Sequence, residues 1–346
     1  MKKITFDSLT VELGRNCNMI PQCNHCFRGD AQNIKITPQI IDEFFEQTEM
    51  IGSLFFAGGE PTLYVDEMRY FLQQLYKCGI PLLDLSIISN GLIFSDEIVD
   101  LIKDYSKMIK YCCETGFGHP VDITHYVVLG ISIDRYHNNK AEAEANLLKY
   151  RSALEGYAQV VRVAYGNTPR KEGRGANLRS GMCKLDLTNT MKRRVEILSK
   201  SRKPLCPQYQ TYKLLYPEQI IICCDMYLSA KGDILTSALG MHDYSIVDNN
   251  AICSVQDNIY ENILFYNQGR IDCCSLIKQE AIEKEKHPLN DMGDALYWLM
   301  HAHEDDSDMI QKDPVIGYIP QDTFKNNPAY IDKIRRRAAE RDYLVK

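Results

Sequence analysis

Residues 53–61, Ser-Leu-Phe-Phe-Ala-Gly-Gly-Glu-Pro, join a short apolar run to a glycine pair, a carboxylate and a proline. The run from Ser53 to Ala57 predicts a short buried strand, because it is apolar and ends at glycine. Glycines at the end of a strand let the backbone come close to a ligand, and proline fixes the exit of the loop. The Glu60 carboxylate would there accept from an ammonium group. Alone, two glycines after a strand form an ordinary turn, so this stretch indicates a binding site only together with a second motif.

Short apolar runs alternate with amphipathic stretches on both sides of this strand. The other predicted strands cover 9–13, 83–88, 126–133 and 159–164. The predicted helices run from a Thr37 cap and Pro38 to Gly52, from about Met68 to Gly79, onward from a Ser95 cap, and from Lys140 to Tyr157. Strands that alternate with helices predict a parallel sheet with crossover helices. Periodicity leaves open whether that sheet is doubly wound or a barrel.

The character of the sequence changes at about residue 204. Short strands are predicted at 220–223, near 228 and at 234–236, around a turn at 231–233, and six of the 13 cysteines lie between Cys206 and Cys274. At about 150 residues per domain, the chain is long enough for one large domain and a smaller one. We expect a domain over 1–203, a cysteine-bearing extension over 204–276 and a helical tail over 277–346.

Composition excludes several classes of protein. The 346 residues carry a formal net charge of −6, which argues against a general nucleic-acid-binding surface. The sequence has neither an apolar run long enough to span a membrane nor a secretory signal, so we expect a cytoplasmic protein. In a reducing compartment, 13 cysteines point to metal or redox chemistry and away from disulfides. Their odd number weakens a disulfide framework further.

Three of these cysteines, Cys17, Cys23 and Cys26, follow the first predicted strand and define what we call the cysteine loop, residues 17–26. Three thiolates on one loop can face one centre. An iron–sulfur cluster held by three thiolates keeps one iron free for a further ligand, whereas a structural zinc site closes its tetrahedron. His25 is an alternative fourth ligand, but its place between two of the cysteines favours a ring that points away.

With Gly-Gly-Glu-Pro at 58–61 on the next strand, the cysteine loop resembles that of the radical S-adenosylmethionine (SAM) superfamily. Five residues separate Cys17 from Cys23, whereas the commonest family pattern has three. The resemblance implies an α/β fold, a partial (β/α)6 TIM-like barrel with a small α+β C-terminal extension. A parallel α/β barrel carries its active site at the carboxyl ends of its strands, where all these motifs are predicted.

The resemblance also assigns roles to residues of this sequence. Cys17, Cys23 and Cys26 would bind a 4Fe-4S cluster whose free iron takes the methionine end of SAM. Further SAM-binding residues would be Phe27 beside the adenine, Gly58, Gly59, Glu60 and Pro61 at the amino group, and Ser89, Asn90, Ser132 and Asp134 at the ribose or the carboxylate. Arg174, in Gly-Arg-Gly-Ala, would pair with a carboxylate or lie on the surface.

The segment after residue 204 is similar in layout to the auxiliary-cluster extension, of SPASM or twitch type, of radical SAM peptide-modifying enzymes. It has a Gly232-Asp233 hairpin and an Asn258-Ile259 segment, but a cysteine expected after the hairpin is replaced. Two readings stay open. Some of the cysteines bind a second iron–sulfur cluster, or all are small core residues; they are Cys206, Cys223, Cys224, Cys253, Cys273 and Cys274.

The resemblance implies a radical SAM enzyme that cleaves SAM reductively to a 5′-deoxyadenosyl radical and abstracts hydrogen from its substrate. The C-terminal layout favours a peptide or protein side chain as substrate. The alternatives are a small molecule or nucleotide with no auxiliary cluster, and a metal-stabilised binding module that cleaves no SAM. Either enzyme would need an electron donor such as a flavodoxin or ferredoxin, and no membrane partner is expected.

Overall fold

The computed structural model describes residues 2–26, 28–117, 120–134, 136–137, 139–163, 174, 195, 197–198, 220–236, 251–270, 310–313 and 317–320. Their main feature is one sheet, with strand order β5-β4-β3-β2-β1-β7-β8-β9. Its strands are β1 (Ile4–Gly14), β2 (Thr48–Gly58), β3 (Leu82–Ser89), β4 (Val127–Ser132), β5 (Gln159–Val163), β7 (Ile220–Leu228), β8 (Asp233–Thr236) and β9 (Cys253–Ser254), with β6 (Ile197–Leu198) beside β7.

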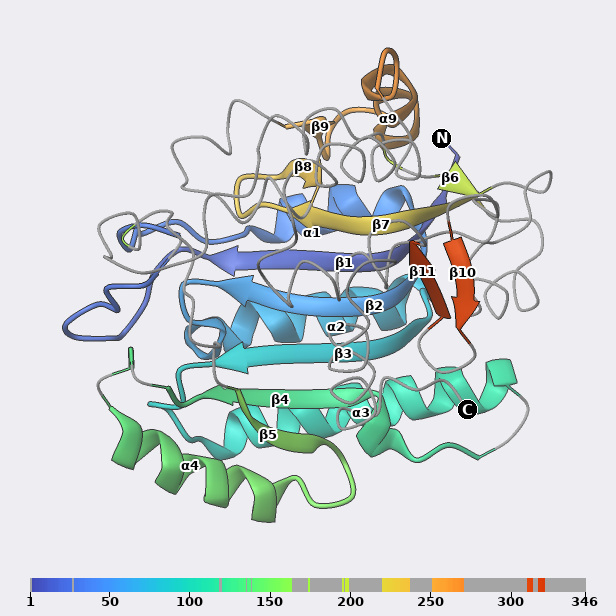
Figure 1. The fold of residues 1–346 in the computed structure, drawn as a ribbon. Coiled ribbons are helices and arrows are strands. Elements are labelled where there is room, and N and C mark those ends of the chain that lie inside the picture. The colour runs from blue at the N-terminus through green and yellow to red at the C-terminus, as the bar shows by residue number, and fades with distance from the viewer. Residues whose placement is uncertain are drawn as a thin grey trace. The chain divides into compact units, whose positions relative to one another are not determined.

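Strands β1 to β5 and β7 run parallel, and Figure 1 shows the arrowheads of β1, β2 and β3 pointing to the same side. The predicted class, α/β with a parallel sheet, is confirmed. Over the described residues the sheet remains open, with β5 and β9 at its ends. The strand predicted at 220–223 is longer than expected. It is β7, which pairs with the edge of β1 that does not contact β2 and so belongs to the same sheet.

The helices between the parallel strands are α1 (Pro38–Glu46), α2 (Val65–Cys78), α3 (Asp96–Phe117) and α4 (Lys140–Ala153). Two short 3-10 turns, Pro61–Leu63 and Ile123–His125, precede α2 and β4. None of the described helices is long and apolar enough to cross a membrane.

Local signals set most helix ends. Thr37 caps α1, since its side chain accepts from the backbone N–H of Ile40 at 3.4 Å, and Pro38 occupies the first helical position. Ser95 caps α3 in the same way, with its hydroxyl 3.2 Å from the N–H of Ile98. Helix α2 stops at Gly79, whose φ of +63° is the left-handed conformation that glycine adopts at low cost. These three predictions are confirmed.

The prediction that the first helix continues to Gly52 is wrong. Helix α1 ends at Glu46 and β2 begins at Thr48, which pairs with Ile4 of β1. The edge of β1 offers hydrogen bonds that continuing the helix would leave unmade, so pairing overrides the local pattern. Helix α4 likewise ends at Ala153 before the predicted Tyr157.

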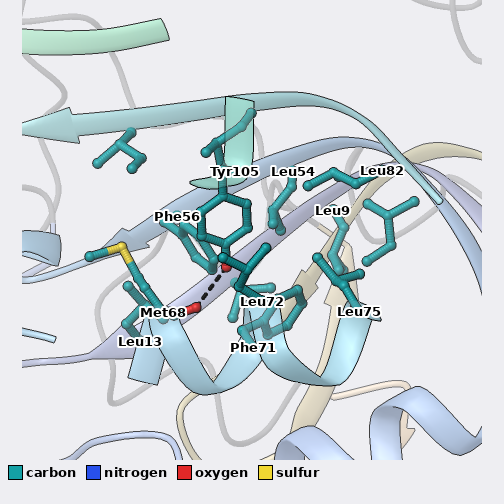
Figure 2. Packing of buried hydrophobic residues seen from close by; sticks show 14 of the residues in the cluster. Leu9, Leu13, Leu54, Phe56, Met68, Phe71, Leu72, Leu75, Leu82 and Tyr105 are labelled. Atoms are coloured by element: carbon teal, nitrogen blue, oxygen red, sulfur yellow. Dashed lines mark hydrogen bonds between the residues drawn. The ribbon is translucent and has the colours of Figure 1, made fainter. Parts of the chain in front are cut away.

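The core lies between the sheet and the helices, and Figure 2 shows part of it. Phe56 of β2 packs edge-on against Phe71 of α2 and Tyr105 of α3, with ring centroids 5.6 and 5.8 Å away. The buried Tyr105 hydroxyl donates to the backbone carbonyl of Met68 at 2.7 Å, so the tyrosine enters the core with its polar atom satisfied. This packing fixes the strands whose carboxyl ends carry the candidate site.

The C-terminal part of the sheet is tied to the junction of α1 and β2 by Gln47. Its buried amide donates to the carbonyls of Val255 and Asp257 at 2.9 and 2.8 Å and accepts from the N–H of Ile259 at 3.0 Å. Ile259 begins α9 (Ile259–Tyr266), which Asn258 caps. In a separate unit, β10 (Ile310–Asp313) pairs antiparallel with β11 (Gly317–Pro320).

Candidate active site

The cysteine loop leaves the carboxyl end of β1 and is closed at its base by backbone hydrogen bonds. The N–H of Arg15 donates to the carbonyl of Ile34, and the N–H of Gln32 donates to the carbonyl of Arg15, both at 2.9 Å. All three cysteines are free thiols. Burial, together with the neighbouring Cys17 and Cys26, raises the pKa of Cys23 to about 12. The three thiols therefore lie within electrostatic reach of one another.

The glycine pair at the end of β2 packs directly on the start of the cysteine loop. The N–H of Gly59 donates to the Gly14 carbonyl and that of Glu60 to the Asn16 carbonyl, both at 2.9 Å. A Cβ atom at Gly59 would lie 1.9 Å from the Asn16 carbonyl oxygen, and one at Gly58, whose φ is +145°, 2.3 Å from the Gly14 oxygen. The close approach that glycine permits here is between two segments of this chain.

The side chain of Glu60 is buried between the ends of β2 and β3. One oxygen accepts from the Thr62 N–H at 3.1 Å and the Thr62 hydroxyl at 2.7 Å, and the other from the Asn90 N–H at 2.8 Å. Burial raises the Glu60 pKa above its usual range, in opposition to these hydrogen bonds. A carboxylate oxygen can accept more than one hydrogen bond, so Oε2 can take a further donor beside the Asn90 N–H. Pro61, also buried, begins the 3-10 turn that follows.

Asn90 connects the end of β3 to the cysteine loop. Its side-chain amide donates to the Asn18 side-chain oxygen at 2.7 Å and lies 3.9 Å from the Cys17 sulfur. Ser89 is buried and accepts from the N–H of Gly91 at 3.0 Å, which shapes the turn after the strand. The ends of β1, β2 and β3 thus meet at one place, as the motifs predict.

Asp134, just beyond β4 and the buried Ser132, completes the group. Its Oδ1 lies 2.8 Å from the N–H of Tyr136 and 2.8 Å from Nδ1 of His137, whereas its buried Oδ2 has no hydrogen-bond partner among the described residues. Burial alone would raise the Asp134 pKa, but the hydrogen bonds from His137 and Tyr136 outweigh it and lower the pKa. A carboxylate oxygen of Asp134 lies within 4.8 Å of a ring nitrogen of His25, so Asp134 lies beside the cysteine loop.

His25 and His137 are functional candidates that sequence reasoning left aside. Burial, together with the adjacent His137, lowers the pKa of His25 to about 4. Its ring centroid lies 4.9 Å from that of His137 and 4.8 Å from that of Tyr136. In the sequence, the only sign of this contact is that His137 follows Asp134 by three residues, just after a predicted strand. In a loop between a strand and a helix, however, a spacing of three residues does not determine whether two side chains come into contact.

The comparison with protein families matches residues 11–148 to the Radical SAM superfamily. This segment belongs to the radical SAM superfamily. It spans β1 to α4 and contains the cysteine loop, the Gly-Gly-Glu-Pro turn, Asn90 and Asp134. Residues 11–148 of this chain therefore form a radical SAM domain.

One solved structure, described as native anSMEcpe with bound AdoMet and Cp18Cys peptide, is similar over 98% of each chain, with 12% identity and a TM-score of 0.46. None of the curated proteins compared with the sequence matches it.

Beyond the matched segment, Arg174 reaches back to the cysteine loop of the radical SAM domain. Its N–H donates to the Cys26 carbonyl at 2.9 Å and its Nε to the Cys23 carbonyl at 3.2 Å. Its Nη1 lies 3.3 Å from the Gln22 side-chain oxygen and 2.6 Å from a carboxylate oxygen of Asp30. The sequence left open whether Arg174 pairs with a carboxylate or lies on the surface. In the structure it pairs with the carboxylate of Asp30, a residue of this chain. Phe27 lies outside the described residues.

A buried ion cluster that the motifs did not predict underlies the cysteine loop. Glu12 of β1 is fully buried and accepts from Nε of Arg15 at 3.1 Å, Nη1 of Arg28 at 3.3 Å and the N–H of Ala230 at 2.9 Å. Arg28 also donates to the Tyr227 hydroxyl. The two arginines flank the cysteine loop in sequence, so one carboxylate holds both of its ends and the turn between β7 and β8.

Among the C-terminal cysteines, strand register separates the two whose side chains are described. Cys253 pairs with Ile234, which pairs with Leu228, while Cys224 lies further back on β7. Two strand spacings and four residues along a strand put their backbones about 16 Å apart, too far for ligands of one cluster. Both pack against the core. Cys206, Cys273, Cys274 and the side chain of Cys223 lie outside the described residues.

Proposed function

We propose that this radical SAM enzyme modifies a side chain of a peptide or protein, with its cluster on Cys17, Cys23 and Cys26 and SAM bound at the ends of β2, β3 and β4. The observation that carries the site is the meeting of three free thiols, the Glu60 turn and Asn90 at the carboxyl ends of adjacent parallel strands. Parallel α/β folds bind their ligands at this edge.

The residues present fit the cofactors of the family. Three thiols within electrostatic reach match a cluster with one open iron, and the orphaned, buried Oδ2 of Asp134 beside them is an acceptor without a donor. When bound, the cluster and SAM supply reductive cleavage of SAM to methionine and a 5′-deoxyadenosyl radical, which takes hydrogen from the substrate.

The chain's own residues would bind the cluster and orient SAM. Cys17, Cys23 and Cys26 act as thiolates toward iron, and Asn90 holds the first of them through its amide. Glu60 offers Oε2 to the ammonium group of SAM, while Thr62 fixes the carboxylate through Oε1. Asp134 offers Oδ2 to a hydroxyl donor. Low exposure at Cys23, Glu60 and Asn90 keeps water from these groups, which strengthens each interaction.

A peptide substrate is supported by the C-terminal layout. The hairpin expected around Gly232-Asp233 is formed by β7 and β8, and the expected Asn258-Ile259 segment caps and starts α9. The second candidate substrate is a small molecule or nucleotide, with no auxiliary cluster. It is favoured by the wide separation of Cys224 from Cys253, which excludes one cluster held by both.

Anaerobic reconstitution followed by dithionite reduction tests the activity. We expect 5′-deoxyadenosine by mass spectrometry from the native chain and none from Cys17→Ser, while Cys78→Ser, which removes an exposed cysteine, behaves as the native chain does. Absence of deoxyadenosine from well-loaded native enzyme would refute the proposal. About eight irons per chain would support an auxiliary cluster and a peptide substrate, and about four the small-molecule alternative. Candidate peptides encoded by neighbouring genes serve as substrates.

A further inference from the structure

Asp134 is buried and its partner His137 is partly buried, and a hydrogen bond joins the two side chains. The side chains expose 4% and 11% of their surface, and Nδ1 of His137 lies 2.8 Å from Oδ1 of Asp134. An ionised carboxylate only accepts hydrogen bonds, so Nδ1 of His137 is the donor. With the Tyr136 N–H at 2.8 Å on the same oxygen, two donors fix Oδ1.

The other oxygen of Asp134 is left for a different partner. Oδ2 is buried and makes no hydrogen bond within the part of the chain that the structure describes, and an acceptor in that state carries a desolvation cost that a native structure seldom leaves uncompensated. The residue follows β4 at the edge of the sheet where the cysteine loop lies, and its charge is felt at Cys23. A donor on a ligand bound beside the cysteine loop would satisfy Oδ2.

The imidazole of His137 is itself held in place. The ring of His25, from the cysteine loop, meets it in a T-shaped contact with centroids 4.9 Å apart, and the same His25 ring lies 4.8 Å from Tyr136. The orientation of His137 is therefore fixed from the loop side, and through Nδ1 it fixes the plane of the Asp134 carboxylate.

We propose that His137 is a positioning residue that holds Oδ1 of Asp134 so that Oδ2 accepts from the ribose hydroxyls of SAM. This inference rests on the proposed function, because it takes SAM as the ligand at this edge. His137 makes no contact with SAM in this assignment and acts through Asp134.

The test is SAM affinity, measured by equilibrium dialysis on the anaerobically reconstituted full chain with iron content as the check on loading. We expect His137→Ala to raise the Kd for SAM roughly tenfold, because a hydrogen bond to a charged group is lost. His137→Asn, whose amide can donate from the position of Nδ1, should restore affinity to within about threefold of native. Iron content should stay at the native level in both.

The chain offers a matched control. His125 and Asp122 form a pair with the same spacing, but it is exposed and its atoms are 3.9 Å apart. His125→Ala should leave the Kd unchanged. In an Asp134→Ala background, His137→Ala should have no further effect, since its only route to the ligand is then gone.

Equal Kd values for His137→Ala and His125→Ala would overturn the proposal, as would a full effect of His137→Ala in the Asp134→Ala background. Failure of His137→Asn to improve on His137→Ala would also overturn it, because packing alone would then account for the loss. In each of these cases SAM binding by the native chain is unaffected, so the proposed function is not contradicted. Loaded native protein that binds no SAM would refute both.

Discussion

At the scale of single residues, the buried carboxylate of Glu12 accepts hydrogen bonds from two arginines and one backbone N–H. Replacing it leaves two buried guanidinium groups and a backbone N–H without their shared acceptor. We expect Glu12→Ala to lower the free energy of unfolding by about 3–5 kcal/mol, the range for breaking a buried ion pair. Urea unfolding followed by circular dichroism measures it.

The control for this variant is Glu97→Ala, which removes an exposed pair with Arg69. Exposed pairs contribute little, so a change of about 0.5 kcal/mol or less is expected. Similar losses for the two variants would contradict the central role given to Glu12.

Gly59 supports a second prediction at this scale. The carbonyl of Asn16 occupies the place of a Cβ atom, and that carbonyl belongs to the backbone leading into the cysteine loop. Gly59→Ala should therefore displace the loop and reduce iron incorporation severalfold. Gly156→Ala is the comparison, because its Cβ would meet nothing within 4 Å, although its φ of +75° carries some strain. Normal iron content in Gly59→Ala would show that the contact can relax.

At the scale of elements, Asp84 of β3 pairs across to Ser53 of β2, whose hydroxyl donates to it at 2.7 Å. Burial raises the Asp84 pKa, and the Ser53 hydroxyl opposes this. Because the folded pKa lies above the unfolded one, the native state holds its proton more tightly. The contribution of Asp84 to stability therefore falls as pH rises from its ordinary value through the raised one.

Asp84→Asn removes this titration. The difference in urea unfolding free energy between Asp84→Asn and the native chain should shift in favour of the variant as pH rises from about 4 to about 7. A difference that stays constant over this interval would contradict the raised pKa.

The elements also show what the sequence could predict. Ser95 and Gly79 mark helix ends correctly because their effects are local: a hydroxyl caps its own helix, and glycine adopts a left-handed turn. The end of α1 was missed because it is decided by the pairing of Thr48 with Ile4, a contact between distant parts of the sequence.

The candidate site divides in the same way. The cysteine loop and the Glu60 turn were found because their residues are consecutive. His137 and the Glu12 cluster were not, since their roles depend on which strands lie side by side. The Ala230 N–H reaches Glu12 across 218 positions of sequence. Sequence patterns that span a few residues cannot predict a contact between residues so far apart.

At the scale of the whole molecule, Arg174 joins the segment after β5 to the cysteine loop across 151 positions. Its bonds to the loop carbonyls are part-buried, whereas Asp30 is exposed. Arg174→Ala should speed the loss of iron to a chelator severalfold, and Asp30→Ala should not, because exposed ion pairs contribute little. Iron release followed by absorbance measures both rates. Equal rates would assign the effect to the ion pair.

Strand β1 has a neighbour on each side, β2 and β7, which lie far apart in sequence. During synthesis the ribosome releases the cysteines early, but Ala230, whose N–H bonds Glu12, only after about two hundred more residues, which takes tens of seconds at about 5–20 residues per second. Until then the two arginines that flank the cysteines have an incomplete anchor. The anchor that Glu12 gives to the cysteine loop is therefore complete only when the chain has been made as far as Ala230.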